Sequence, residues 1–145
     1  MTNSPVKKKI LIANSKPDFI RLLQMQLSHP GHGILLATNG SQAIDLAIAQ
    51  RPDLIILHLT LPDMDGLEVA RCIRQIPGTH AIPILAVAET FLPQEKERSF
   101  QCGCNDYISK PFTSLMPLTR VRNLSGSYRL YSSRHPDNSQ LLQSD

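Results

Sequence analysis

Residues 51–68 read Arg-Pro-Asp-Leu-Ile-Ile-Leu-His-Leu-Thr-Leu-Pro-Asp-Met-Asp-Gly-Leu-Glu. Residues 54–57 form a nearly continuous apolar run that ends at His58, which is typical of a central strand covered on both faces. Residues 62–66 have the composition of a turn, and a helical pattern starts at Leu67. A strand, a turn and a helix in this order predict one unit of a parallel sheet whose strands are joined by crossover helices.

The same alternation continues on both sides of this segment. Apolar runs predict further strands at 9–13, 33–38, 82–88 and 106–109, and helical periods predict helices at 17–28, 42–50, 67–76, 93–101 and 114–124. In the helix at 42–50, the residues expected on the buried side are Ala43, Ile44, Ala47 and Ile48. Five strands alternating with five helices predict a three-layer α/β sandwich. The ligand site of such a fold is expected at the carboxyl ends of the strands.

The composition is that of one ordinary globular domain, with 145 residues, 41% of them hydrophobic, and 15 Lys and Arg against 12 Asp and Glu. Apolar runs such as 54–57 and 84–88 are far shorter than the roughly 20 residues that span a bilayer. The apolar run at 10–13 is also too short for the core of a secretory signal. These features predict a cytoplasmic protein with no membrane partner.

The chain divides into three parts by composition. We expect an N-terminal lead at 1–7, an ordered domain at 8–124, and a flexible tail or linker at 125–145, where Ser, Asn, Gln, Arg and Tyr replace the apolar periodicity. The net charge of +3 includes only a small basic block at Lys7 and Lys8, and the tail has no pattern of a recognition helix. We therefore expect no nucleic-acid binding by this chain.

Five segments together carry a family resemblance. They read Ile-Leu-Ile-Ala-Asn-Ser-Lys-Pro at 10–17, Ala-Thr-Asn-Gly-Ser-Gln-Ala at 37–43, the stretch 51–68 given above, Ile-Pro-Ile-Leu-Ala-Val at 82–87, and Gly-Cys-Asn-Asp-Tyr-Ile-Ser-Lys-Pro-Phe at 103–112. In order and spacing, the chain resembles the receiver domain of bacterial two-component response regulators. The resemblance implies a flavodoxin-like, doubly wound, five-stranded parallel sheet with strand order 2-1-3-4-5 and five helices.

The resemblance also identifies the positions that carry the chemistry of the family. A receiver accepts a phosphoryl group on an aspartate at the end of its third strand, with Mg²⁺ held by that carboxylate and by an acidic pair after the first strand. Here the acceptor position is His58, and the acidic pair is replaced by Asn14 and Ser15. The hydroxyl that grips the phosphoryl group after the fourth strand is replaced by Ala88, so that only the family lysine, Lys110, remains.

These replacements predict a degenerate phosphoacceptor pocket. Mg²⁺ requires oxygen ligands that usually include one or two carboxylates, and none of the five positions supplies a carboxylate. The formal charge of the pocket moves from about −2 in a typical receiver to about +1, so we expect neither Mg²⁺ binding nor any other cofactor. The nearest carboxylates in the sequence, Asp63, Asp65 and Glu89, are expected to be solvated loop or helix-cap residues.

His58 itself has two interpretations. Imidazole can form a phosphoramidate, so a nucleophilic role is chemically conceivable. The interpretation we favour is that His58 fills the space of the aspartate, with a ring nitrogen hydrogen-bonded to Ser15, Asn14 or a backbone carbonyl. In neither case does the sequence contain a nucleophile and base pair or a Gly-rich phosphate loop that would indicate an enzyme of another kind.

The leading functional prediction is a non-enzymatic pseudo-receiver in two-component or phosphorelay signalling. Such a module acts by contact with a signalling protein such as a sensor kinase or an effector domain. One alternative is a switch that responds to a small ligand, an anion or pH through His58 and Lys110, because the pKa of histidine lies near physiological pH. Another is the regulatory domain of a longer transcription regulator.

A candidate interface follows from the family resemblance, since receivers commonly bind partners or a second copy through the face built from the fourth helix, the fifth strand and the fifth helix. Tyr107 is expected there as a half-exposed strand residue, and Tyr is enriched at protein interfaces. Phe100, Arg98 and Arg120 complete the candidate set for a signalling partner or a homodimer.

Overall fold

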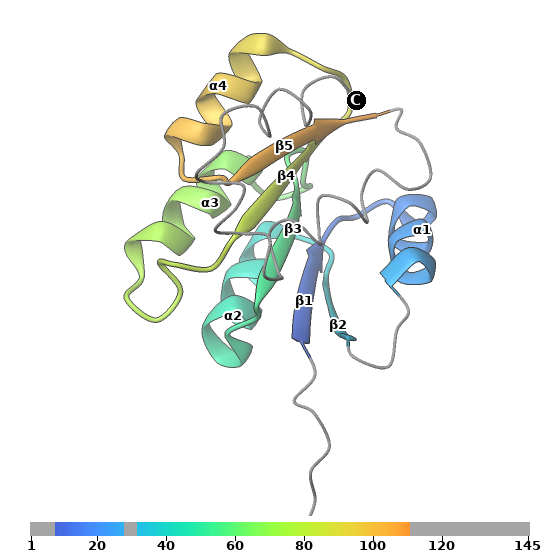
Figure 1. The fold of residues 1–145 in the computed structure, drawn as a ribbon, viewed down its shortest axis with the longest axis vertical. Coiled ribbons are helices and arrows are strands. Elements are labelled where there is room, and N and C mark those ends of the chain that lie inside the picture. The colour runs from blue at the N-terminus through green and yellow to red at the C-terminus, as the bar shows by residue number, and fades with distance from the viewer. Residues whose placement is uncertain (1–7, 28–31, 111–145) are drawn as a thin grey trace, which may run out of the picture.

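A computed structural model describes residues 8–27 and 32–110 of the chain. Its single sheet contains the strands β1 (Lys8–Ala13), β2 (His32–Ala37), β3 (Leu54–His58), β4 (Ile84–Ala88) and β5 (Asp106–Ser109). All strand pairs are parallel, and the order is β2-β1-β3-β4-β5. The predicted flavodoxin-like sheet and its strand order are therefore confirmed (Figure 1).

Four helices connect these strands within the described part of the chain: α1 (Pro17–Leu27), α2 (Gly40–Gln50), α3 (Gly66–Gln75) and α4 (Pro93–Gln101). The fifth predicted helix, at 114–124, lies outside the described residues, as do the lead at 1–7 and the tail at 125–145. None of the described helices has the length and apolar character that crossing a bilayer requires.

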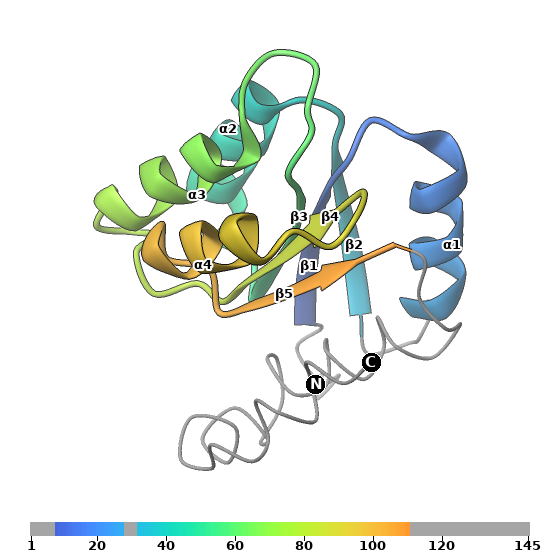
Figure 2. The same ribbon diagram turned by 90° about the horizontal axis from the view of Figure 1, so that it is seen from above.

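The sheet is covered on both faces, which confirms the layered architecture. Figure 2 shows α1 on one face and α2, α3 and α4 on the other. Successive side chains of a strand point to opposite faces, so each strand contributes to both sides. In β1, Ile10 and Ile12 pack with residues of α1, whereas Leu11 and Ala13 pack with residues of α2 and α3.

Polar side chains determine where α2 and α3 begin. The side chain of Asn39 caps α2 by accepting a hydrogen bond from the amide of Gln42 at 2.8 Å. The carboxylate of Asp63 accepts two more from the amides of Gly40 and Ser41, at 2.7 and 3.0 Å, and these bonds lower the pKa of Asp63. Asp65 caps α3 through the amide of Leu67. The prediction that Asp63 and Asp65 are loop and cap residues is thus confirmed.

One prediction about the core of α2 is wrong. Ile48 was expected on the buried side, but it is exposed, and the buried side of the helix is formed by Gly40, Ala43 and Ala47. These small residues occupy a narrow stripe, and Ile48 lies one position beyond Ala47, about 100° further around the helix axis. A stripe of this width buries only the residues closest to its centre.

Candidate functional site

The positions predicted to form the pocket lie where the strands end. In the parallel register, Ala13 pairs with Leu57 and His58 with Val87, so Asn14 follows β1 beside the last residue of β3. Ala88 pairs with Ser109, and the amide of Lys110 donates to the carbonyl of Ala88 at 3.0 Å. The sheet therefore brings Asn14, His58, Ala88 and Lys110 to one edge, as the sequence predicts. Ser15 is exposed to solvent.

His58 is completely buried and has a contact on each ring nitrogen. Its Nδ1 lies 2.8 Å from the carbonyl oxygen of Thr60. Its Nε2 lies 2.9 Å from Oε2 of Glu89, and the ring of Phe19 from α1 packs at 6.3 Å between centroids. Of the expected partners for the ring, the backbone carbonyl is the one found.

Glu89 is the residue of the site that the sequence analysis placed wrongly. It was expected to be a solvated loop residue, but its Oε2 also lies 3.2 Å from Nζ of Lys16 and 3.5 Å from Nζ of Lys110. The pocket therefore contains one carboxylate after all, and two ammonium groups surround it. With His58 neutral, two positive charges and one negative charge leave a formal charge of +1.

The pKa values in the pocket follow from burial and these contacts. Burial lowers the pKa of His58 and Lys110 lowers it further, while the Thr60 carbonyl and Glu89 partly oppose this shift. Partial burial alone would raise the pKa of Glu89, but Lys16, Lys110 and His58 together hold it below its usual value. Glu89 is thus ionised at neutral pH, and the neutral form of His58 is favoured.

Asn14 and Lys110 have further contacts in the pocket. The Oδ1 atom of Asn14 accepts a hydrogen bond from the amide of Lys16 at 2.8 Å. The ammonium of Lys110 lies 4.6 Å from the centre of the Phe19 ring, a cation–π contact in addition to its pairing with Glu89. Ala88 is buried and has no hydroxyl to offer. Oδ1 of Asn14 and the ammonium of Lys110 thus have partners, whereas Nδ2 of Asn14 is buried without a hydrogen-bond partner among the described residues.

A magnesium ion, which the family resemblance implies, does not fit this set of donors. Glu89 supplies the only carboxylate among these pocket residues, and both lysines compete for it. Within residues 8–27 and 32–110, no three His, Cys, Asp or Glu side chains gather at a spacing that holds a metal ion. Mg²⁺ would have to displace two ammonium groups and would gain one carboxylate.

Tyr107 does not lie on the surface as expected. Tyr107 is only 4% exposed, because α4 covers β5. Its neighbours in the strand, Asp106 and Ile108, are buried as well. The hydroxyl donates to Oε1 of Glu95 at 3.0 Å and accepts from the amide of Leu92 at 3.3 Å. Burial raises the pKa of Tyr107 to about 12. Tyr107 therefore anchors the start of α4, and the prediction that it is half-exposed is wrong.

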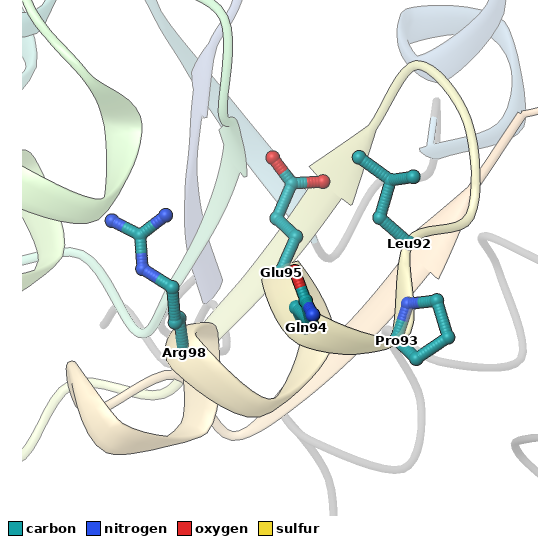
Figure 3. Close-up of a pocket in the computed structure, with 5 residues that line it drawn as sticks. All are labelled: Leu92, Pro93, Gln94, Glu95 and Arg98. Carbon is teal, nitrogen blue, oxygen red and sulfur yellow. The ribbon is translucent and has the colours of Figure 1, made fainter.

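The surface around the start of α4 is apolar and accessible. Phe91 and Leu92, which precede α4, are 54% and 52% exposed, Phe100 near the end of α4 is 44% exposed, and Arg98 is also exposed. Figure 3 shows a pocket of about 490 Å³ here, which is lined by Leu92, Pro93, Gln94, Glu95 and Arg98. Of the predicted interface residues, Phe100 and Arg98 thus lie on the surface, and Arg120 lies outside the described residues.

Comparison with known proteins identifies the family. Residues 10–121 match the response regulator receiver domain. The chain belongs to this receiver family. The receiver domain is 32% identical over 117 residues to the alkaline phosphatase synthesis transcriptional regulatory protein PhoP of Bacillus subtilis, which covers 81% of this chain and 48% of that protein. It is 36% identical over 114 residues to the response regulator ArlR of Staphylococcus aureus, which covers 79% and 51%.

Among solved structures, the receiver domain is similar to that of the sensor histidine kinase PA1611 from Pseudomonas aeruginosa, which has a magnesium ion coordinated in its active site cleft. The TM-score is 0.76 and the identity 30%, with 84% of this chain and all of that chain covered. The receiver domain studied here spans about half the length of the curated relatives that it matches.

Proposed function

We propose that this receiver domain is a pseudo-receiver. It is a cytoplasmic, non-catalytic module that takes part in two-component signalling by contact with a sensor kinase or an effector domain, and it does not accept a phosphoryl group. The observation that carries the proposal is the state of His58 at the acceptor position. The imidazole is completely buried, and Glu89 lies directly against its outer nitrogen.

The contacts of His58 argue against a role as a substitute nucleophile. Nδ1 faces the carbonyl of Thr60, which can only accept a hydrogen bond, so the proton of a neutral ring belongs on Nδ1. Nε2 is then the nucleophilic nitrogen. A phosphoryl donor would have to reach Nε2, and Oε2 of Glu89 lies 2.9 Å from that atom. While Glu89 holds this position, its carboxylate blocks the approach and repels an anionic donor.

The electrostatics of the pocket support the same conclusion. Phosphoryl transfer to a carboxylate depends on a divalent cation that neutralises the charge developing on the transferred group. Here the two lysines neutralise Glu89 instead of a substrate, and Asn14 and Ser15 replace the acidic pair. The pocket lacks both the acceptor and the electrostatic catalyst of the reaction.

The exposed surface at α4 is the part of the domain that suits protein contact. Phe91, Leu92 and Phe100 present apolar side chains to solvent, and Arg98 adds a positive charge at their edge. Aromatic residues and Arg are enriched at protein interfaces. A sensor kinase, an effector domain or a second copy of the chain is the partner that we propose for this surface, and nucleic acid is not among the proposed partners.

The proposal is tested by incubating the full chain with acetyl phosphate and Mg²⁺ and measuring its intact mass. We expect no gain of a phosphoryl group and no change in the NMR spectrum around His58 on addition of beryllofluoride. A variant that combines Asn14→Asp, Ser15→Asp and His58→Asp supplies three carboxylates and serves as the positive control for the assay. A saturable mass gain of the unaltered chain would overturn the proposal.

A further inference from the structure

The contact between His58 and Glu89 depends on which ring nitrogens of His58 carry a proton, and the function proposed above does not use this dependence. Nδ1 of His58 must carry a proton, because the carbonyl of Thr60 cannot donate one. Nε2 of the neutral ring is then an acceptor. It lies 2.9 Å from a carboxylate oxygen, which is also an acceptor, and neither atom has a hydrogen-bond partner in the described part of the chain.

Two acceptors at this distance repel each other unless a proton lies between them. The contact is favourable when the pair has bound one additional proton, which makes it an imidazolium beside a carboxylate. The other charged groups near the pair are Lys110 after β5 and Lys16 after β1, while α1 contributes the uncharged ring of Phe19. Both lysines attract the carboxylate in either state, and the proton decides whether the imidazole adds to this attraction or opposes it.

We propose that His58 and Glu89 form a proton-operated latch, which closes when Nε2 takes up a proton from solvent and opens when that proton is released. His58 is fixed by its burial, whereas the side chain of Glu89 is 40% exposed and has room to move outward. Opening therefore displaces Glu89 and leaves the imidazole in place. This inference rests on the proposed function, for which it supplies a form of regulation that needs no phosphoryl group.

The position of Glu89 connects the latch to the surface proposed for partner binding. Residues 89–92 join β4 to α4, so Glu89 marks one end of a short segment whose other end is Leu92. Tyr107 contacts that segment through the amide of Leu92 at 3.3 Å and the carbonyl of Thr90 at 3.4 Å. Its ring packs edge-on against Phe91 at 6.0 Å between centroids.

A backbone movement that accompanies the release of the Glu89 side chain is confined to these few residues, because β4 lies on one side and the contacts of Tyr107 on the other. The two side chains that project from the segment are Phe91 and Leu92, and both are exposed. The protonation state of the pair therefore changes how these apolar side chains are presented beside the α4 pocket. Acidification closes the latch and neutral to alkaline pH opens it.

An NMR titration of the full chain from about pH 8 to about pH 5 tests the latch. We expect the ring signals of His58 and the amide signals of residues 89–92 to titrate with one common midpoint. In Glu89→Gln the midpoint moves to lower pH, because a carboxylate that favours the imidazolium is lost. Glu97→Gln, which removes a carboxylate from the exposed side of α4, leaves the midpoint unchanged.

The latch is overturned if the His58 ring shows no titration in this range, if residues 89–92 fail to follow it, or if Glu89→Gln leaves the midpoint where it was. Should Glu89→Gln not fold, the titration of the unaltered chain still decides between these outcomes. The failure of the latch is distinct from the failure of the proposed function. A silent His58 leaves the pseudo-receiver intact, whereas a mass gain with acetyl phosphate refutes the pseudo-receiver and leaves the titration result standing.

Discussion

Gly66, the first residue of α3, allows the helix to begin directly against the end of β3. An ideal Cβ atom at this position would lie 2.6 Å from Cα of Leu59 and 2.8 Å from the carbonyl oxygen of His58. Both neighbours are backbone atoms of the strand end that carries the pocket. The amide of Gly66 also donates to the carbonyl of Leu59 at 2.9 Å. Replacing Gly66 with Ala therefore forces the helix and the strand end apart.

The size of the effect follows from these distances. Ordinary van der Waals contact for a Cβ atom begins near 3.4 Å, so the new methyl group must retreat by about 0.8 Å from Leu59. Overpacking of this kind costs about 1–3 kcal/mol, and stretching the hydrogen bond to Leu59 adds about 1 kcal/mol. The lower entropy of the unfolded Ala chain offsets about 1 kcal/mol. The net destabilisation expected for Gly66→Ala is about 2 kcal/mol.

Urea unfolding followed by circular dichroism measures this loss. With an m-value of about 1–1.5 kcal/mol/M for a domain of this size, the midpoint of Gly66→Ala should fall by about 1–2 M. Gly33→Ala is the matched control, because a Cβ atom at Gly33 meets only the carbonyl of Lys8 at 3.9 Å. The free energy of unfolding of Gly33→Ala should differ from that of the unaltered chain by no more than about 0.5 kcal/mol. Equal midpoints for the two variants would refute the packing argument.

Three further predictions concern the pocket and the α4 surface. His58→Asp alone should gain no phosphoryl group from acetyl phosphate in an intact-mass assay, because Asn14 and Ser15 still provide no carboxylate for the metal ion. Burial lowers the native pKa of His58 below 6.5, so the unfolded chain binds more protons and stability decreases as the pH falls through about 6.5 towards the native pKa. His58→Gln should remove this part of the pH dependence, which urea midpoints near pH 8 and near pH 5 would reveal. Phe100→Ser should weaken capture of a partner or self-association in sedimentation experiments and change the free energy of unfolding by no more than about 0.5 kcal/mol, since Phe100 is 44% exposed.

The sheet could be predicted because each strand is a short apolar run and each connecting helix has a clear period. The ends of two elements differ from the predicted bounds, and local chemistry explains each difference. The strand predicted at 82–88 begins at Ile84, since Pro83 has no amide hydrogen to donate to a neighbouring strand. The helix predicted at 42–50 begins at Gly40, because Asn39 and Asp63 accept hydrogen bonds from its first amides.

The positions in the pocket could be predicted from the family resemblance, but the partner of His58 could not. The residues next to Glu89 in the sequence do not indicate that it contacts Lys16, His58 and Lys110, because these contacts exist only after the sheet has formed. The burial of Tyr107 was missed for a similar reason. Whether a residue of an edge strand is covered depends on how α4 lies across β5, which the sequence of β5 alone does not specify.

Alternation along the strands is nevertheless a signal that points to Glu89. Val87 belongs to the core on the α1 face and Ala88 to the core on the opposite face, so continuing the alternation by one residue directs Glu89 to the α1 face. The same rule directs His58, two residues after Ile56, to that face. A strand end should therefore be analysed one residue beyond its last apolar position.

The presence of Glu89 also changes the meaning of the pocket charge. Counting Lys110 alone gives +1, and counting Lys16, Lys110 and Glu89 gives +1 again, yet the two sites differ chemically. In the first, a free ammonium group would await an external anion. In the second, the carboxylate of Glu89 already occupies that role, and an anion can bind only by displacing it. These contacts support our proposal that the site is regulated by a proton on the His58–Glu89 pair and does not recruit an anion from solution.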